Sequence, residues 1–493
     1  MIDEAERDGR KLRIHLIAIG GTGMAPLACL LQELGHEVVG SDQPLYPPMS
    51  DLLAQAGIEP GVGFEPSRLE GPDAPDLVIV GNAVPRTNPE AEAAEARDLP
   101  RMSMPEAVGR FLLEGRRSLV AVGTHGKTTT STMAAWVLRA CGRDPGYLVG
   151  GAPIGLEGSF GLGNGTDFVL EGDEYNASYF DREAKFLHYR PRTVTLTSVE
   201  YDHVDLYPSA EAFRAAFHKL VGLLPADGLL VACADTPEVR DVAAEASCPV
   251  IAYSGSASGD LHVPPNAQRI VRPKSEPRAG TEGMEFEVEG AQGEGDEVEF
   301  RLQVWGNHNV ANALAVWSAV VGNGVDEHEA AAALSSFRGV RRRLEVVGDE
   351  RGVLFVDDFA HHPTEVDASL GALRGQFPDR RVVALYEPRS LSAGRSDFET
   401  AYLGAFEPAD RVWLAPVFHA GRLGSDERLD LDRLIAGLGS RGIEASTAAS
   451  VEALFDEAVH DLRAGDVVVT MSSGAFGGAA RALRDRFAAR SRD

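Results

Sequence analysis

The chain is poor in cysteine: only four occur among 493 residues, and they are scattered. No two of them have the spacing of a zinc site or of a redox pair, so the sequence excludes a disulfide framework and a cysteine-based metal centre. We expect reduced and mostly packed thiols, as is typical of a protein in the reducing cytoplasm. These cysteines are Cys29, Cys141, Cys233 and Cys248.

Basic residues are also scarce, with 47 Lys and Arg against 74 Asp and Glu, which gives a formal net charge of -27. A chain so acidic, without an extended basic block, is a poor partner for nucleic acid or for an anionic membrane, and we predict neither. A phosphate ligand is not excluded, because a few local cations and backbone N–H groups are enough to bind one.

Long apolar runs are missing, since none reaches the roughly 18 residues that a membrane-spanning helix needs. Residues 1–11 are charged and lack the apolar segment of a secretion signal. We therefore predict a cytoplasmic protein.

Hydrophobic residues nevertheless make up 44% of the chain, enough for several buried cores, and the length predicts two to four domains. Strand-like apolar runs alternate with helical segments through most of the chain, a pattern typical of doubly wound α/β folds. We predict three α/β domains, each built on a largely parallel sheet. Residues 254–300 are the exception, because short alternating stretches there predict a small antiparallel excursion. The predicted domains are residues 1–115, 116–336 and 337–493.

The strongest motif is the segment 118–130, SLVAVGTHGKTTT. Its apolar half predicts a buried strand that breaks at Gly123, and its second half predicts a helix from Lys127 to about Arg139. A glycine turn between a strand and a helix presents backbone N–H groups to an anion, as in a phosphate-binding loop. We predict that Lys127 reaches the terminal phosphates of a nucleotide and that the Thr128 hydroxyl binds Mg²⁺. The alternative is a glycine-rich turn with an exposed lysine.

Polar side chains also follow the next two predicted strands of the central domain. Glu171 comes after the apolar run 168–170, and His203 lies shortly after the strand 193–197. Since the carboxyl ends of parallel strands meet at one edge of a sheet, we expect both side chains beside the phosphate loop, where they would hold a divalent cation. Taken one at a time, such an acid is more typical of a solvated loop, and such a histidine of a structural hydrogen bond.

The first domain opens with a strand that ends at residues 20–23, Gly-Gly-Thr-Gly, and continues through a helix to a second strand that ends at Asp42. Glycines at the first turn and an acid after the second strand are typical of a Rossmann-like domain that binds a dinucleotide or a nucleotide sugar. Pro26 occupies the third glycine position of the dinucleotide pattern. Asn82 follows a further predicted strand. The alternative is a tight turn that binds no ligand.

The third domain repeats the pattern of polar groups at the ends of predicted strands, so we expect it to be Rossmann-like and to close over the ligand cleft. Its most basic segment, Arg341-Arg342-Arg343, contains an arginine that suits the terminal phosphates of a nucleotide. A salt-bridged surface turn is an equal alternative for this segment.

Another polar cluster, residues 306–309, precedes an alanine-rich helix of the central domain. We expect Asn307 or Asn309 to cap this helix, which covers about residues 310–321. Asn312 follows Asn309 by three residues, and we therefore expect both side chains on one face of the helix.

Six motifs occur in a fixed order: Gly123-Thr-His-Gly-Lys-Thr-Thr, Glu171-x-Asp-Glu, Glu200-x-Asp-His203, His308-Asn-x-x-Asn312, Arg342-Arg343 and Asp357-Asp-x-x-His-His-Pro-Thr364. Together they resemble the Mur ligases, the ATP-dependent amide ligases of bacterial cell-wall precursor synthesis, over nearly the whole chain except 254–300. The doubled histidine before Pro363 and the Gly-Thr-His form of the loop resemble the branch of the family that accepts UDP-N-acetylmuramate.

The resemblance implies an enzyme that uses ATP to convert a carboxylate into an acyl phosphate, which an amine then attacks. Within this branch, one kind of enzyme adds L-alanine, and another attaches the ready-made tripeptide L-alanyl-γ-D-glutamyl-meso-diaminopimelate during peptidoglycan recycling. The segments 46–50, 81–89, 387–390 and 476–478 resemble the second kind. We therefore expect the tripeptide as the amine substrate, with L-alanine as the alternative.

The resemblance also implies roles for the residues that match the family motifs, and Ser198 stands where the family usually has asparagine. Residues implied at ATP and Mg²⁺ are Gly123, Thr124, His125, Gly126, Lys127, Thr128, Thr129, Glu171, His203, His308, Asn309, Asn312, Arg343 and Asp358. Residues implied at the UDP-sugar are Gly21, Gly23, Asp42 and Asn82, and those at the incoming peptide are His361, Arg389 and Ser473. The implied metal ligands are Thr128, Glu171 and His203, and the implied catalytic residues are Lys127, Glu171, His203 and Arg343. We expect a monomer or a weak dimer.

Two other classes of protein account for fewer of these residues. A nicotinamide dehydrogenase, suggested by residues 20–23 and Asp42, would leave the phosphate loop unexplained. A nucleotide-binding protein without catalytic activity would leave the combination of Lys127, Glu171 and His203 unexplained.

Overall fold

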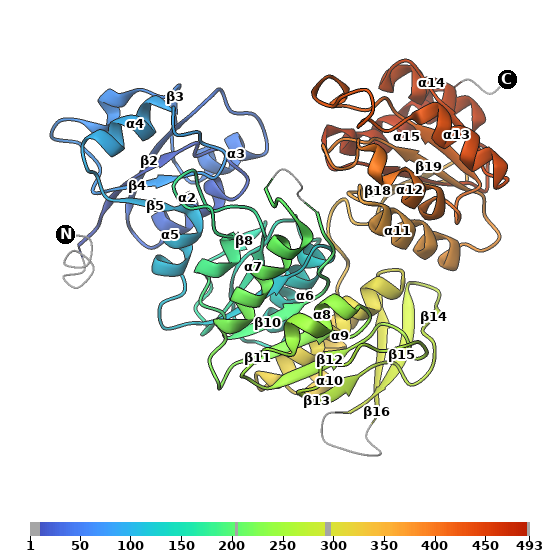
Figure 1. The fold of residues 1–493 in the computed structure, drawn as a ribbon, viewed down its shortest axis with the longest axis horizontal. Helices are drawn as coiled ribbons and strands as arrows, with labels where there is room; N and C mark the ends of the chain where they lie inside the picture. Colours follow the sequence, from blue (N-terminus) through green and yellow to red (C-terminus); the bar gives the residue numbers. More distant parts are fainter. Residues whose placement is uncertain (1–9, 203–205, 291–296, 491–493) are drawn as a thin grey trace.

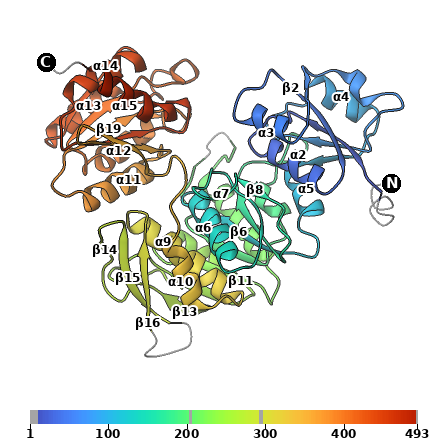
Figure 2. The ribbon, with the colours of Figure 1, turned by 180° about the vertical axis from the view of Figure 1, so that it is seen from behind.

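The structure is a computed structural model that describes residues 10–202, 206–290 and 297–490. Three α/β units follow one another along the chain, and the first and third stand on either side of the second (Figure 1). Figure 2 shows the same arrangement from behind, with the three units still side by side. Each unit is built on a largely parallel sheet, so the predicted fold class is confirmed.

The first sheet has five strands in the order β3-β2-β1-β4-β5, and all its pairings are parallel. Apolar side chains such as Leu16 and Ile79 are fully buried in its core. The strands are β1 (Arg13–Ile17), β2 (Glu37–Asp42), β3 (Gly61–Val62), β4 (Leu77–Val80) and β5 (Arg101–Ser103). The helices are α2 (Met24–Glu33), α3 (Met49–Gln55), α4 (Pro89–Ala96) and α5 (Met104–Phe111).

The buried carboxylate of Glu90, in α4, links this helix to side chains of strands β1 and β2. Its Oε2 lies 3.0 Å from His15 Nε2 of β1, and its Oε1 lies 3.1 Å from Arg68 Nη1. The Ser41 hydroxyl of β2 also donates to it. Burial opposes the charge of Glu90, but the hydrogen bonds from His15 and Ser41 outweigh burial and lower its pKa. The network fixes β1 and β2 against α4, and so positions the glycine turn after β1.

The central sheet has eight strands in the order β13-β12-β11-β10-β6-β9-β7-β8, all parallel except the edge strand β8. Since β6 lies between β10 and β9, the carboxyl ends of these three strands are neighbours. The strands are β6 (Arg117–Val122), β7 (Gly146–Leu148), β8 (Phe160–Gly161), β9 (Asp167–Gly172), β10 (Thr193–Leu196), β11 (Leu229–Cys233), β12 (Val250–Tyr253) and β13 (Ala267–Val271). The helices are α6 (Lys127–Ala140), α7 (Ala210–Gly222), α8 (Pro237–Ala243), α9 (Asn307–Gly322) and α10 (Glu327–Ser335).

The predicted antiparallel excursion is a small sheet of β14 (Arg278–Ala279), β15 (Met284–Glu289) and β16 (Glu297–Leu302). Side chains alternate between buried and exposed along β15 and β16, and Phe286 stacks on Phe300 with ring centroids 4.7 Å apart. The ring centroids of Phe300 and of Trp317 in α9 lie 5.9 Å apart. The segment differs from the prediction in one respect, because β13 pairs in parallel with β12 and extends the central sheet.

Helix α9 begins without a side-chain cap, so the predicted cap by Asn307 or Asn309 is wrong. Gly306 occupies the capping position with a φ of 88°. Asn309 instead donates through Nδ2 to the Trp305 carbonyl oxygen at 2.8 Å. Asn312 donates to Asn309 Oδ1 at 3.2 Å, which confirms that these two side chains share a face.

The third sheet has six strands in the order β17-β18-β22-β19-β20-β21, all parallel except the edge strand β17. The strands are β17 (Glu345–Glu350), β18 (Val353–Asp358), β19 (Val382–Tyr386), β20 (Arg411–Leu414), β21 (Glu444–Thr447) and β22 (Val467–Met471). The helices are α11 (Pro363–Gln376), α12 (Glu399–Ala405), α13 (Leu431–Ser440), α14 (Val451–Asp461) and α15 (Ala479–Ala489). Within the described part of the chain, no helix combines the length and the apolar character that crossing a bilayer requires.

Candidate active site

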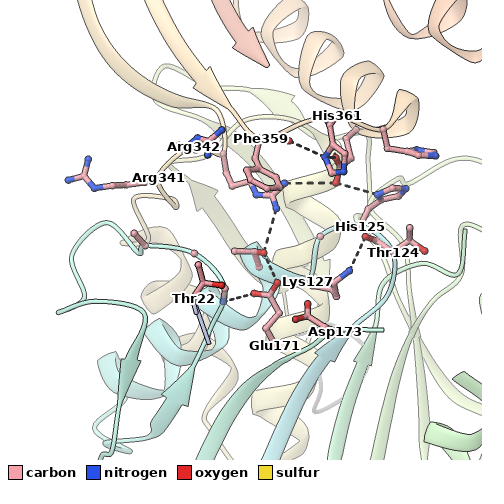
Figure 3. A pocket seen from close by; sticks show the side chains of 18 of the residues that line it. Thr22, Thr124, His125, Lys127, Glu171, Asp173, Arg341, Arg342, Phe359 and His361 are labelled. Carbon is pink, nitrogen blue, oxygen red and sulfur yellow. Dashed lines mark hydrogen bonds and ion pairs between the residues drawn. The ribbon is translucent and has the colours of Figure 1, made fainter. Parts of the chain in front are cut away.

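The three units meet at a cavity of about 690 Å³. Thr22 lines it from the first unit, Lys127 and Glu171 from the second, and Arg343 and His361 from the third. Figure 3 shows these walls, with Lys127 and Glu171 on one side and His361 on the opposite side. Glu171 lies beside the phosphate loop, as expected, whereas His203, the other residue expected there, lies outside the described residues.

The phosphate loop between β6 and α6 depends on two glycines with positive φ. Gly123 has a φ of 130°, and Gly126 has a φ of 80°. A Cβ on Gly126 would lie 2.8 Å from Asn312 Oδ1, so this position needs glycine for steric reasons as well. Ser198 supports the loop, because its hydroxyl accepts a hydrogen bond from the His125 backbone N–H at 2.9 Å.

Lys127 is held at the start of α6 by three acceptors. Its Nζ donates to the carbonyl oxygens of Gly123 at 2.6 Å and Thr124 at 3.1 Å, and it lies 3.0 Å from the buried carboxylate of Glu174. Burial opposes the charge of Lys127, but Glu174 and the neighbouring carboxylates outweigh burial and raise its pKa. The ammonium group is therefore charged, and a phosphate group at the loop would compete with Glu174 for it.

Thr128 and Glu171 form an oxygen-rich wall beside Lys127. Thr128 Oγ1 donates to Glu171 Oε1 at 2.8 Å, and the Gly150 backbone N–H donates to Glu171 Oε2 at 2.7 Å. Burial, together with nearby Asp173, raises the pKa of Glu171. The Thr128 hydroxyl and the half-buried Glu171 carboxylate are hard oxygen donors, and this donor set fits Mg²⁺. His203, the third expected ligand, lies outside the described residues.

His125 of the loop lies between two carboxylates that belong to different domains. Its Nε2 is 2.9 Å from Glu200 Oε2, which follows β10, and its Nδ1 is 3.3 Å from Glu365 Oε1 of α11. Burial opposes the charge of His125, but its hydrogen bonds to these carboxylates outweigh burial and raise its pKa to about 9. The Thr364 hydroxyl donates to Glu200 at 2.9 Å and adds a second link between the central and third domains.

The sequence prediction included His125 only as a member of the loop and did not include Glu365. The one local signal for Glu365 is its place in the first turn of α11, where a carboxylate is favoured by the helix dipole. Its contact with His125 joins positions far apart in the chain, so no local pattern could have indicated it.

The three consecutive arginines have different partners. Arg341 Nη1 pairs with Glu345 at 2.8 Å, as in the salt-bridged alternative. Arg342 Nη2 donates to two carbonyl oxygens in the turn after β22, at 2.6 and 3.0 Å. Arg343 Nη2 lies 3.5 Å from Thr128 Oγ1, so it is the arginine of this cluster that reaches the phosphate loop.

A second cavity, of about 280 Å³, lies between the central and third domains. Burial and the nearby Arg343 lower the pKa of His308 to about 4, so its ring is neutral at neutral pH. Burial raises the pKa of Asp358 to about 6. The sequence prediction missed Asp235 and Tyr253, which line the cavity from the ends of β11 and β12. The expected nucleotide-site residues on its wall are His125, Gly126, Thr129, His308, Asn309, Asn312, Arg343 and Asp358.

A third cavity, of about 550 Å³, lies between the first and central domains. It shares Thr22, Gly150 and Glu171 with the 690 Å³ cavity where the three units meet, which we call the central cavity. The two cavities therefore adjoin at Glu171. The sequence prediction missed Lys185 and Tyr189, which line it from the central domain.

The residues expected at the UDP-sugar have different positions around the turn after β1. Gly23 lines the third cavity. Gly21 donates through its N–H to the Ala18 carbonyl oxygen at 3.2 Å within the turn. Asp42 Oδ2 accepts from the Gly20 N–H at 2.8 Å and holds the turn against β2. Asn82 is exposed just after β4.

The residues expected at the incoming peptide belong to the third domain. His361 lines the central cavity. The Arg389 guanidinium lies 3.5 Å from the centre of the Phe418 ring and 3.5 Å from Glu387 Oε1. Ser473 is half-buried in the turn after β22.

The class of protein follows from matches to known families along the chain. Residues 13–116 match the Mur ligase family catalytic domain, residues 122–320 the Mur ligase middle domain, and residues 342–474 the Mur ligase glutamate ligase domain. The chain belongs to the Mur ligase family, as its motifs indicated, and is therefore a ligase of an ATP-dependent, amide-forming family.

Individual relatives show how far the similarity extends along the chain. The UDP-N-acetylmuramate–L-alanyl-γ-D-glutamyl-meso-2,6-diaminoheptandioate ligase of Escherichia coli (strain K12) is 37% identical over 480 residues, 97% of this chain and 98% of that protein. A UDP-N-acetylmuramate–L-alanine ligase of Rubrobacter xylanophilus is 40% identical over 413 residues, 84% of this chain and 86% of that protein. The crystal structure of a murein peptide ligase from Psychrobacter arcticus has a TM-score of 0.67 at 31% identity, with 98% of this chain and 100% of that chain covered.

Proposed function

We propose that this protein joins L-alanyl-γ-D-glutamyl-meso-diaminopimelate to the lactyl carboxylate of UDP-N-acetylmuramate, with conversion of ATP to ADP and phosphate. The observation that carries the proposal is the meeting of Lys127, Glu171 and Arg343 at one cavity, between a cavity that holds the expected nucleotide residues and another that adjoins the glycine turn. This arrangement of the three cavities suits transfer of a phosphoryl group from a nucleotide to the carboxylate of a nucleotide sugar.

The residues of the central cavity account for activation of the acid. Lys127 and Arg343 are cations placed to stabilise the charge that develops on the transferred phosphoryl group. Thr128 and Glu171 would hold Mg²⁺, which supplies charge neutralisation and orientation of the phosphates. The product of this step is an acyl phosphate, which reacts readily with water. The links from His125 and Thr364 hold the third domain over the loop and so limit access of water.

The choice of amine rests on similarity along the whole chain. The Escherichia coli relative, named for the tripeptide, spans nearly all of both proteins. L-alanine remains the second candidate, because the Rubrobacter xylanophilus relative is slightly more identical over a shorter part of the chain. We further propose the domain bounds 1–115, 116–336 and 337–493, a cytoplasmic location, and a monomer or weak dimer.

One incubation distinguishes the two amines. The protein is mixed with UDP-N-acetylmuramate, ATP, Mg²⁺ and equal amounts of L-alanine and the tripeptide, and the UDP-containing products are weighed by mass spectrometry. We expect the tripeptide adduct as the main product, with one ADP released per amide formed. An adduct of L-alanine alone would contradict the recycling assignment and leave the ligase assignment intact, whereas ADP release without either adduct would contradict both.

A further inference from the structure

The ring of His361 has a defined orientation at the central cavity. Its Nδ1 lies 3.2 Å from the Phe359 carbonyl oxygen and 3.2 Å from Glu365 Oε2. A carbonyl oxygen and an ionised carboxylate can only accept hydrogen bonds, so the Nδ1 of His361 must carry the hydrogen. In the neutral ring the lone pair is then on Nε2. His361 lines the cavity that also contains Lys127 and Glu171 (Figure 3).

Glu365 is held in its ionised form where it faces His361. Burial opposes its charge, but His361 and His125 outweigh burial and hold the pKa of Glu365 well below its usual range. His125 Nδ1 lies 3.3 Å from the other carboxylate oxygen, and Arg343 Nη1 lies 3.9 Å from it. Glu365 also lies in the first turn of α11, where the helix dipole favours a negative charge.

The backbone of His361 is fixed as well. Its carbonyl oxygen accepts hydrogen bonds from the hydroxyls of Tyr386 at 2.7 Å and Tyr402 at 2.8 Å, and both tyrosines are fully buried. The Glu365 carboxylate also accepts from the His361 backbone N–H at 3.2 Å. The backbone that carries this ring is therefore anchored by side chains of the third domain.

Other candidate bases on the same cavity wall have assigned partners. Glu174 pairs with Lys127, Asp173 pairs with Lys185, and Asp357 lies 3.8 Å from the Arg342 guanidinium. The buried His362 accepts from the Thr364 N–H through Nδ1. Among the described lining residues, His361 is the imidazole whose protonated nitrogen faces a carboxylate and whose other nitrogen is an acceptor.

We propose that His361 is the general base that deprotonates the incoming amine, and that Glu365 is the positioning residue that fixes its tautomer. This inference rests on the proposed ligase function and deepens it. The arriving ammonium group transfers one proton to His361 Nε2. The freed nitrogen lone pair then forms the C–N bond at the acyl carbon, the C–O bond to phosphate breaks, and the bonding pair leaves on the phosphate. The second proton passes from nitrogen to the departing phosphate, and His361 releases its proton to solvent.

Hydroxylamine separates this step from activation of the acid. It is largely unprotonated at neutral pH, so it traps an acyl phosphate as a hydroxamate without help from a base. For His361→Asn, we expect amide formation from the tripeptide to fall by about 10²-fold or more, the usual contribution of a general base. Hydroxamate formation from UDP-N-acetylmuramate and ATP should stay within a few-fold of wild type, which also shows that the variant is folded. The matched control is His218→Asn, which removes a surface histidine paired with Glu245 at 2.9 Å and should change neither rate.

The possible outcomes are distinct. Wild-type amide formation by His361→Asn would overturn the inference and leave the ligase function standing. Loss of hydroxamate together with amide would also overturn it, because His361 would then be needed before the amine enters. If the wild-type protein forms neither product, the ligase function itself fails.

The role of Glu365 is tested by Glu365→Gln, with amide formation and hydroxamate formation measured side by side. The amide keeps the size of the side chain but can present an N–H group to His361 Nδ1, so the ring loses the charged acceptor that keeps its hydrogen on Nδ1. We expect kcat for amide formation to fall toward that of His361→Asn, while hydroxamate formation stays within a few-fold of wild type. An equal loss of both rates would contradict the positioning role.

Discussion

Replacement of Lys127 with alanine is expected to lower the rate of amide formation by about 10³-fold or more, because one preorganised charged donor at a developing charge contributes on this scale. Burial opposes the charge of Lys127, but Glu174 and neighbouring carboxylates outweigh burial and raise its pKa. Its Nζ also donates a hydrogen bond to the Gly123 carbonyl oxygen in the loop. Its loss would remove a cation at the expected phosphate position and break the ion pair with the buried Glu174.

The measurement compares turnover and ligand binding in Lys127→Ala. Because Lys127 lines the central cavity, and the third cavity has its own lining residues, we expect the affinity for UDP-N-acetylmuramate, measured by calorimetry, to change little. The control is Lys219→Ala, which removes a lysine bound at 2.7 Å to Glu183 on the surface. Turnover of Lys127→Ala within tenfold of wild type would show that this loop does not handle the transferred phosphate.

Replacement of Glu171 with glutamine is expected to lower the rate by about 10²-fold or more at a saturating ATP concentration, on the scale of a lost electrostatic contact in an active site. The amide keeps the size of the side chain and one acceptor for Thr128 Oγ1 or the Gly150 N–H. It removes the charge that would attract Mg²⁺. Burial and the nearby Asp173 raise the pKa of Glu171, so this wall favours an added positive charge.

A titration with Mg²⁺ tests this assignment. We expect Glu171→Gln to need a higher Mg²⁺ concentration for half-maximal activity, while Glu245→Gln, which alters an exposed surface carboxylate paired with His218, should behave as wild type. A reduced rate with an unchanged Mg²⁺ requirement would assign Glu171 a role in the fold of the loop and none at the metal.

The phosphate loop could be predicted from sequence because its signals are local. The glycines at 123 and 126 adopt positive φ, and the helix begins at Lys127 as expected. Glu171 could be placed as well, because a single rule about the ends of parallel strands determines its position. The prediction that Asn307 or Asn309 caps α9 was wrong, because Gly306 takes the capping position and the Asn309 side chain donates to the Trp305 carbonyl oxygen.

The parts that the sequence could not indicate depend on contacts between distant segments. Glu365 contacts His125 across the boundary of the central and third domains, and neither neighbourhood contains a pattern that specifies the other. The edge strand β17 was also missed, because its side chains are partly exposed and lack a regular apolar alternation. The tautomer of His361 follows only from the positions of Phe359 and Glu365 in space.

In the proposed mechanism, ATP activates the sugar carboxylate as an acyl phosphate within the cavity that Lys127 and Glu171 line. Transfer of isotope tests it most directly. UDP-N-acetylmuramate labelled with ¹⁸O in its lactyl carboxylate is incubated with ATP, Mg²⁺ and the tripeptide, and the released inorganic phosphate is weighed by mass spectrometry. We expect each phosphate formed with an amide to carry a single ¹⁸O from the carboxylate. Amide formation with unlabelled phosphate would contradict it.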